Sequence, residues 1–170
     1  MIPVDARETT GELSLTRAKY EDVTALEAMY HQFEPRGEAL GLPPRTDADT
    51  ENWLRTLSDY LNFLLWDGER VVGHGVLCPF EDTAEVAVFV HQDYRGRGAG
   101  RMLLESLIAE ARRLGLRRIW GIAQPDNLPM LRLARACGLV LGHEPGEFYL
   151  LLKHEDLHPD EVNDPCLIAI

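Results

Sequence analysis

The sequence predicts one α/β domain with a mixed central sheet and helices on both faces. Three observations support this fold class. The chain has 170 residues, the usual size of a single domain. It is 45% hydrophobic and 26% charged, so it holds enough apolar material for a core and enough charge for a solvated surface. Its apolar residues recur with a period of two in some segments and of about 3.6 in others, which indicates strands alternating with helices.

The first third of the chain predicts a strand followed by two helices. Residues 12–17 alternate between polar and apolar side chains, which is typical of a half-buried strand. Residues 22–31 carry their apolar side chains on one face and form a short amphipathic helix. A loop rich in proline and glycine follows at 34–46. Asp47 and Asp49 can then cap a second helix.

The middle of the chain predicts three further strands. Residues 62–66 and 71–78 are apolar runs on either side of an Asp-Gly turn dipeptide, which is the pattern of a hairpin. The next strand covers 84–91 and is apolar except for Glu85 and its last residue. The sequence therefore predicts one isolated carboxylate near the start of a buried strand.

The second half of the chain predicts two helices and three strands. A helix over 100–114 has one apolar stripe and ends at a glycine. Residues 117–123 form a buried strand, and a second helix follows after Asp126-Asn127 and runs to Gly138. Two short strands over 139–143 and 148–153 complete the sheet around a Pro-Gly turn.

Charge excludes one class of partner and points to another. The net charge of −11 argues against binding to nucleic acid, which requires a basic face. The charge is uneven, because residues 95–135 contain nine arginines and three acidic residues. This basic stretch suggests a polyanionic ligand, and the acidic remainder suggests a cationic partner. Arginines on a solvated helix face would give the same pattern.

Hydropathy and cysteine content bound the cellular setting. No apolar run approaches the roughly 20 residues that a membrane helix needs. The first 15 residues are too polar and acidic for a signal peptide, so we expect a cytoplasmic protein with no membrane contact. Cys78, Cys137 and Cys166 are odd in number and widely spaced, which excludes a disulfide framework and a cysteine-based zinc module.

A glycine-rich turn from Arg95 to Arg101 (RGRGAGR) is the segment of the sequence that points most clearly to a ligand. Glycines let backbone N–H groups approach a ligand, the following helix adds its positive end, and the arginines add charged donors. A Walker A loop requires Gly-Lys-Ser/Thr and the dinucleotide fingerprint requires Gly-x-Gly-x-x-Gly, and neither is present. The segment is a cradle for another phosphate ligand or a turn without a ligand.

Two signatures resemble those of the GNAT superfamily of N-acetyltransferases. The first is Arg95-x-x-Gly98-x-Gly100, and the second is the helix that begins at Asn127 and ends in Gly138-Leu139. The resemblance covers residues 12–153. It implies the GNAT fold, a mixed and mostly antiparallel central sheet of about seven strands flanked by about four helices. It also implies one acyltransferase domain over 1–153, followed by an acidic C-terminal extension over 154–170.

The resemblance implies acetyl-CoA as co-substrate and assigns residues to it. The strands at 84–91 and 117–123 would separate and admit the pantetheine arm, which pairs with exposed strand backbone. Asn127 would contact the pantetheine or the start of the next helix. The residues expected at the acetyl-CoA site are Val88, Phe89, Val90, Arg95, Gly96, Arg97, Gly98, Ala99, Gly100, Arg101, Asn127 and Met130.

Glu85 is the candidate general base for acyl transfer to an amine. A protonated amine is not a nucleophile, so a base must take its proton. Apolar neighbours would raise the pKa of the Glu85 carboxyl toward neutral pH, although a solvated carboxylate at the start of a strand fits the same pattern. The segment Ala84–Val88 is similar to bacterial protein-lysine acetyltransferases, in which a glutamate at this point is the base.

The sequence departs from the wider family at two positions. Many members have a tyrosine seven residues after the asparagine, which protonates the leaving thiolate, and here that position is Ala134. Tyr149 and Cys137 are candidate replacements, or the thiolate leaves unaided. The usual proline after the strand is Gln92, a change that we expect to matter little. Trp120 is expected in the core rather than at the substrate.

The sequence fits three classes of function. The first is an N-acetyltransferase for a primary amine such as a protein lysine, a polyamine or an amine-bearing antibiotic, and the alternative is a non-catalytic acyl-CoA sensor. His154 and His158 fit the zinc-peptidase pattern His-Glu-x-x-His, but Pro159 would end the helix and no third ligand follows, so we expect no metal. The apolar C-terminal end at 166–170 suggests docking, either on the domain itself or on a second copy of the chain in a homodimer.

Overall fold

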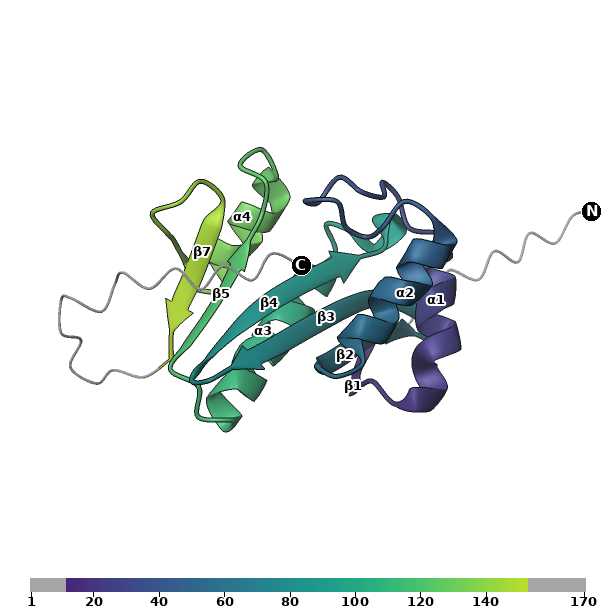
Figure 1. Cartoon of the computed structure of the whole chain (residues 1–170), viewed down its shortest axis with the longest axis horizontal. Helices are drawn as coiled ribbons and strands as arrows, with labels where there is room; N and C mark the ends of the chain where they lie inside the picture. The colour runs from purple at the N-terminus through teal and green to yellow at the C-terminus, as the bar shows by residue number, and fades with distance from the viewer. Residues whose placement is uncertain (1–11, 153–170) are drawn as a thin grey trace, which may run out of the picture.

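The strands and helices follow one another in the order that the sequence predicts. The computed structural model describes residues 12–152, and Figure 1 shows the chain. The elements are β1 (Ser14–Arg17), η1 (Tyr20–Asp22), α1 (Val23–His31), α2 (Asp47–Leu57), β2 (Leu61–Asp67), β3 (Arg70–Phe80), β4 (Thr83–Val90), η2 (Gln92–Tyr94), α3 (Ala99–Arg113), β5 (Arg118–Ile122), α4 (Leu128–Ala136), β6 (Val140–Leu141) and β7 (Glu147–Leu151).

One mixed sheet contains all seven strands of the described residues. Its order is β1-β2-β3-β4-β5-β7-β6. Neighbouring strands are antiparallel except for β4 and β5, which are parallel and are connected through α3. The predicted fold class, a mixed and mostly antiparallel sheet with four helices, is confirmed.

The parallel junction between β4 and β5 is short and divides the sheet into two halves. It consists of three residue pairs: Thr83–Arg118, Ala84–Ile119 and Glu85–Trp120. Beyond Glu85, β4 continues to Val90 while pairing only with β3. β5 stays paired with β7 along its whole length. In Figure 1 the two strands lie side by side at their first residues and then diverge.

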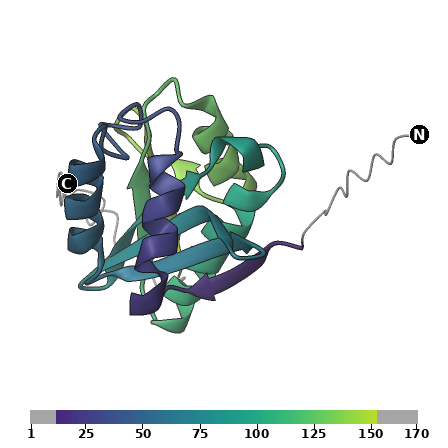
Figure 2. The ribbon, with the colours of Figure 1, turned by 90° about the vertical axis from the view of Figure 1, so that its right-hand side faces the viewer.

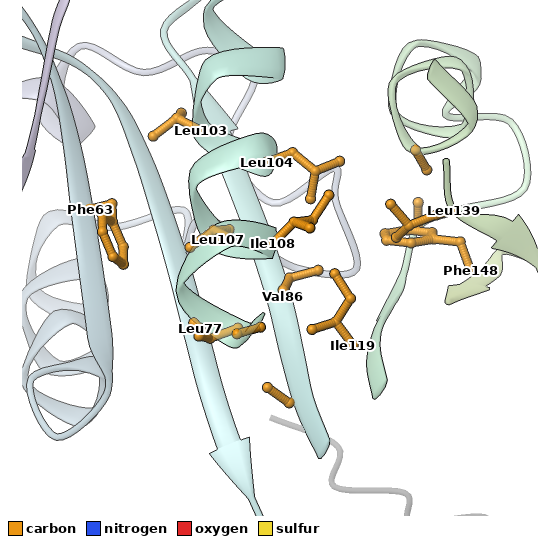
Figure 3. Close-up of a cluster of buried hydrophobic side chains, with 14 of the residues drawn as sticks. Phe63, Leu77, Val86, Leu103, Leu104, Leu107, Ile108, Ile119, Leu139 and Phe148 are labelled. Carbon is orange, nitrogen blue, oxygen red and sulfur yellow. The ribbon is translucent and has the colours of Figure 1, made fainter. Parts of the chain in front are cut away.

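Two hydrophobic clusters cover the two faces of the sheet. On one face α3 packs against β3 and β4, and its buried leucines meet side chains from both halves of the sheet, including Val86, Ile119 and Phe148 (Figure 3). On the other face α1 and α2 lie beside each other and cover β2 and β3 (Figure 2). The second cluster does not include β5 or β7, so their side of this face is left for a site.

The start of α2 differs from the prediction. Thr46, and not Asp47 or Asp49, is the N-cap residue, and its Oγ1 accepts a hydrogen bond from the Asp49 backbone N–H at 3.1 Å. Thr46 has extended backbone angles, as an N-cap residue requires, whereas both aspartates lie inside the first turn. There their charge still favours the positive end of the helix.

A buried hydrogen-bond chain links α1, β2 and β3 through His74. The His74 ring is completely buried, its Nδ1 lies 2.7 Å from the Tyr30 hydroxyl, and its Nε2 lies 2.9 Å from Asn62 Oδ1. Because the Asn62 amide nitrogen donates to the Leu57 and Tyr60 carbonyls, Oδ1 must accept from Nε2–H and Nδ1 must accept from Tyr30. The ring is therefore neutral, and burial lowers its pKa to about 3.

This burial predicts a pH-dependent stability. The folded-state pKa of His74 lies below its ordinary value, so the unfolded chain binds a proton that the folded chain refuses, and stability is lost as the pH falls from 6.5 toward 3. We expect the difference in unfolding free energy between the natural protein and a His74→Gln variant to shrink by about 3 kcal/mol between pH 7 and pH 4. Urea unfolding over this range measures it. Parallel pH profiles for the two proteins would contradict the assignment.

Candidate active site

A cleft of about 2030 Å³ occupies the space between the two halves of the sheet. β4 and β5 form its walls, the 95–101 turn and the start of α4 lie at one end, and the loop of residues 35–43 covers it from the α1–α2 side. The loop was predicted, but its position over the cleft was not. The cleft includes ten of the twelve residues expected at the acetyl-CoA site, and Arg97 and Ala99 are the two outside it.

The edge of β4 offers backbone groups to the cleft. Val86 to Val90 pair with β3 on one side and with no strand of the described residues on the other. Val88 and Val90 pack partly against the α3 cluster, whereas the Phe89 ring is buried in the opposite cluster against Tyr30 and Trp53. Phe89 was expected to line a bound ligand, and its buried ring leaves mainly its backbone to do so.

The three glycines of the 95–101 turn have different roles. Gly96 and Gly98 have φ values of +73° and +86°, and a side chain at either position would meet no atom of the described residues within 4 Å. They are open to a ligand and adopt a backbone conformation that favours glycine. Gly100 is different, because a Cβ there would lie 3.0 Å from Leu133 Cδ2. It allows α3 and α4 to pack closely.

The N-terminus of α3 has the properties of an anion site. Its N-cap residue is Gly98, and no side chain of residues 12–152 caps the first N–H groups. The first turn of this 15-residue helix holds no acidic residue. The N–H groups and the positive end of the helix dipole are thus available to a phosphate group.

The arginines of this turn are not equivalent. Arg95 was expected at the phosphates, but its guanidinium donates to the Val90 carbonyl at 2.9 Å and to the Glu34 carbonyl at 2.7 Å. It therefore ties the end of β4 to the loop over the cleft. Ala99 is buried in the core, which explains why it does not reach the cleft. Arg101 pairs with Glu105 at 2.7 Å at the exposed start of α3.

Gln92 has a structural role that the sequence did not indicate. Its side-chain amide donates to the Gln32 carbonyl at 2.7 Å and accepts from the Glu34 N–H at 3.0 Å. We expected the proline-to-glutamine change at this position to have little effect. In the structure Gln92 makes two hydrogen bonds that a proline could not make, so this expectation is wrong. Gln92 and Arg95 together hold Gln32 and Glu34, the residues just before the 35–43 loop, against the end of β4.

Asn127 and α4 form the other side of the entrance. Asn127 Oδ1 accepts from the Met130 N–H at 3.2 Å and caps α4, and both residues line the cleft. Of the two contacts considered for Asn127, the structure contains the one with the start of the helix. Ala134 is completely buried, so the position of the usual tyrosine belongs to the core here.

Glu85 lies at the branch point of the sheet. It is the last residue of β4 that pairs with β5, and it forms a cross-strand row with Trp120 and Tyr149. Its carboxyl is partly buried and forms no hydrogen bond or ion pair within residues 12–152. Burial raises its pKa above the ordinary value. Burial, and then Glu85 itself, raises the pKa of the neighbouring Cys78 thiol to about 12.

Other predicted residues are distributed unevenly around this row. Tyr149 and Trp120 both line the cleft, so the expectation that Trp120 belongs to the core is wrong. An aromatic residue in an apolar strand gives no sign of which face it takes. Cys137 caps the C-terminal end of α4 and is not among the residues that line the cleft.

The structure bears on whether the chain could bind a metal ion or span a membrane. Within residues 12–152 no group of three or more His, Cys, Asp or Glu side chains could hold a metal ion. His154 and His158 lie outside the described residues, as does the whole 154–170 extension. None of the helices between residues 12 and 152 is long and apolar enough to cross a membrane.

The split sheet, the glycine turn and the uncapped helix fit an enzyme that binds an acyl-CoA. The sequence matches the model of the acetyltransferase (GNAT) family over residues 25–139, and the chain belongs to this family. It is an acetyl-CoA-dependent N-acetyltransferase with the mixed α/β fold of that family. The alternative of a non-catalytic sensor is thereby set aside.

Several relatives and solved structures are similar over most of the chain. L-amino acid N-acyltransferase MnaT of Escherichia coli is 29% identical over 92% of this chain and all of that protein. The [ribosomal protein bS18]-alanine N-acetyltransferase of E. coli is 29% identical over 69% of this chain and 76% of its own length. The structure of yncA from Salmonella typhimurium with acetyl-CoA has a TM-score of 0.67, 23% identity and coverage of 85% and 96%. The GNAT domain of S. lividans PAT has a TM-score of 0.69, 22% identity and coverage of 81% and 89%.

The glycine turn predicts the effect of a single substitution on acetyl-CoA binding. Gly98→Val places a branched side chain where the ligand must approach the α3 N-terminus, and we expect the affinity for acetyl-CoA to fall at least about tenfold. Isothermal titration calorimetry measures the change. Gly68→Val in the β2–β3 turn is the matched control, because Gly68 also has a positive φ of +58° and open surroundings. If a folded Gly98→Val variant binds as the natural protein does, acetyl-CoA does not use this turn.

Proposed function

We propose that this enzyme acetylates a primary amine and that Glu85 is the general base. The observation that carries the proposal is the position of Glu85 at the branch point of β4 and β5, facing the cleft without a protein partner. A carboxyl that is partly buried and unpaired is a better base near neutral pH than a solvated one, because its raised pKa increases its proton affinity.

Different residues of the cleft would bind acetyl-CoA and take the proton of the amine. Acetyl-CoA supplies an acetyl thioester, and the fit to this chain rests on the free edge of β4, the open Gly96 and Gly98, and the α3 N-terminus. The amine forms a C–N bond as the C–S bond breaks, and its proton passes to Glu85. Glu85 is partly buried, so its carboxyl is not fully solvated.

The leaving thiolate has less help from the protein than the amine does. Tyr149 lies two strands from Glu85, about 10 Å away at ordinary strand spacing, with Trp120 between them. Ala134 carries no acid. A thiolate is a tolerable leaving group near neutral pH, whereas a protonated amine cannot react at all. We therefore infer that proton removal by Glu85 contributes more to the rate than any acid does.

The acceptor is, in our proposal, an α-amine, rather than the lysine side chain, polyamine or antibiotic amine that the sequence also allows. MnaT is named for L-amino acids, and the bS18 enzyme for an alanine, which has no nitrogen in its side chain. Acidic residues around the cleft favour the approach of a cationic amine. They are Glu38, Glu81, Asp82, Asp126, Glu144 and Glu147. A small amine and a protein terminus both satisfy these features, and a homodimer stays a prediction.

Replacement of Glu85 tests the role of the base. Glu85→Gln keeps the size of the side chain but cannot take a proton, so we expect kcat to fall by about 10²–10⁴-fold with little change in acetyl-CoA affinity. The natural enzyme should lose activity as the pH falls through the raised pKa of Glu85, because its carboxyl is then protonated. The deficit of the variant should shrink at high pH, where free amine is abundant.

Tyr149→Phe is the matched comparison for Glu85→Gln. It keeps the ring and removes only the hydroxyl, so we expect a smaller loss of kcat than Glu85→Gln causes. Thiol release from acetyl-CoA over a pH series measures both variants. Near-natural kcat for Glu85→Gln at neutral pH would remove Glu85 from the mechanism, and a larger loss for Tyr149→Phe would reverse the ranking of base and acid.

A further inference from the structure

Arg118 occupies a defined place on the wall of the cleft. It is the first residue of β5, paired with Thr83 on one side and Leu151 on the other. It precedes Trp120 by two positions, so its side chain leaves the sheet on the same face as Trp120 and Glu85. It also lines the cleft. In the sequence, Arg118 is only one arginine of the basic stretch at 95–135.

The Arg118 guanidinium lies near Tyr149, in the cross-strand row of Glu85, Trp120 and Tyr149, and no carboxylate of residues 12–152 pairs with it. Its Cζ lies 5.8 Å from the centre of the Tyr149 ring, and Tyr149 is in the row with Trp120 and Glu85. Its Nε is buried without a hydrogen-bond acceptor. No carboxylate of residues 12–152 forms an ion pair with Arg118. The neighbouring Arg117, in contrast, pairs with Asp82 at 2.9 Å.

A partly buried arginine without an acceptor has a cost, because water has been removed from its charge and no protein group replaces that water. Six arginines of the described chain have carboxylate partners. They are Arg17, Arg36, Arg55, Arg101, Arg113 and Arg117. Arg101 and Arg117 also line the cleft, but both are paired with carboxylates. Arg118 lines the cleft without a carboxylate partner, and its Nε is buried without an acceptor, so its planar donors are free for a ligand. A guanidinium of this kind matches a carboxylate, which it can bind through two hydrogen bonds.

We propose that Arg118 binds the carboxylate of the acetyl acceptor, which is therefore a free α-amino acid. The inference rests on the proposed function, with Glu85 receiving the proton of the amine. In the row, Glu85 lies on one side of Trp120, and Tyr149 with the Arg118 guanidinium lies on the other. An α-amino acid above Trp120 places its amine toward Glu85 and its carboxylate toward Arg118. A lysine side chain or a peptide N-terminus offers no carboxylate at that distance.

The test compares each of the twenty standard L-amino acids with its carboxamide, which has the same side chain and amine without the negative charge. Thiol release from acetyl-CoA by the full chain measures kcat and KM. We expect the best amino acid to exceed its carboxamide about 100-fold in kcat/KM, because the buried cation loses its partner with the carboxamide. Equal rates for acid and carboxamide would overturn the proposal, as would acetylation confined to peptide lysines or polyamines.

Variants connect the preference to Arg118 itself. Arg118→Gln should raise KM for amino acids about 100-fold and leave the carboxamide rates and the acetyl-CoA KM unchanged. Arg118→Lys should recover part of the loss, because it keeps the charge without the planar fork. Arg112→Gln, an exposed change at the end of α3, is the control. Equal losses for amino acids and carboxamides in Arg118→Gln would show a structural role and overturn the proposal.

Failure of the proposed function has a different signature. If no amine releases thiol, the proposed reaction fails, and calorimetry of the same amino acids with the CoA-bound enzyme then tests Arg118 alone. Binding by the natural protein that is lost in Arg118→Gln would support the carboxylate site. Absence of binding by the natural protein would overturn it. If Glu85→Gln keeps its rate, Glu85 is not the base, but the preference for amino acids over carboxamides can still be measured.

Discussion

The three residue pairs between β4 and β5 are the constraint on which the whole site depends. They hold the two halves of the sheet together over a single short stretch and end at Glu85. A longer junction would pair the rest of β4 and close the cleft, and a shorter one would detach β5 and β7 from the other strands. The junction ends at Glu85, so the proposed base lies where the free edge of β4 begins and directly across from Trp120.

The junction can be short because the core spans it. α3 packs its leucines against Val86 of β4 and Ile119 of β5, so burial of apolar surface joins the halves where hydrogen bonds do not. Gly121 allows the closest approach, since a Cβ at this position would lie 2.9 Å from the Val86 carbonyl oxygen and 2.6 Å from the Phe148 ring. Gln92 and Arg95 hold Gln32 and Glu34, from which the 35–43 loop begins, and this loop lines the cleft.

Periodicity was sufficient to predict the order of the elements, because burial on one face repeats every two or 3.6 residues. Glu85 could be singled out for the same reason, since one carboxylate interrupts an apolar strand. The roles of Gln92, Arg95 and Arg118 were not predictable. Gln92 and Arg95 reach residues about 60 positions away, and such contacts leave no local pattern. Arg118 was hidden because adjacent arginines look alike in a sequence, although only Arg117 meets Asp82.

Hydrogen–deuterium exchange of β4 with and without acetyl-CoA tests the central claim most directly. If the free edge of β4 receives the pantetheine arm, saturating acetyl-CoA should slow exchange at backbone amides of residues 86–90 and of the 96–101 turn. Exchange in β2, which has a partner strand on both sides, should not change. Unchanged exchange at residues 86–90 in the saturated enzyme would show that the divergence of β4 and β5 does not form the acetyl-CoA site.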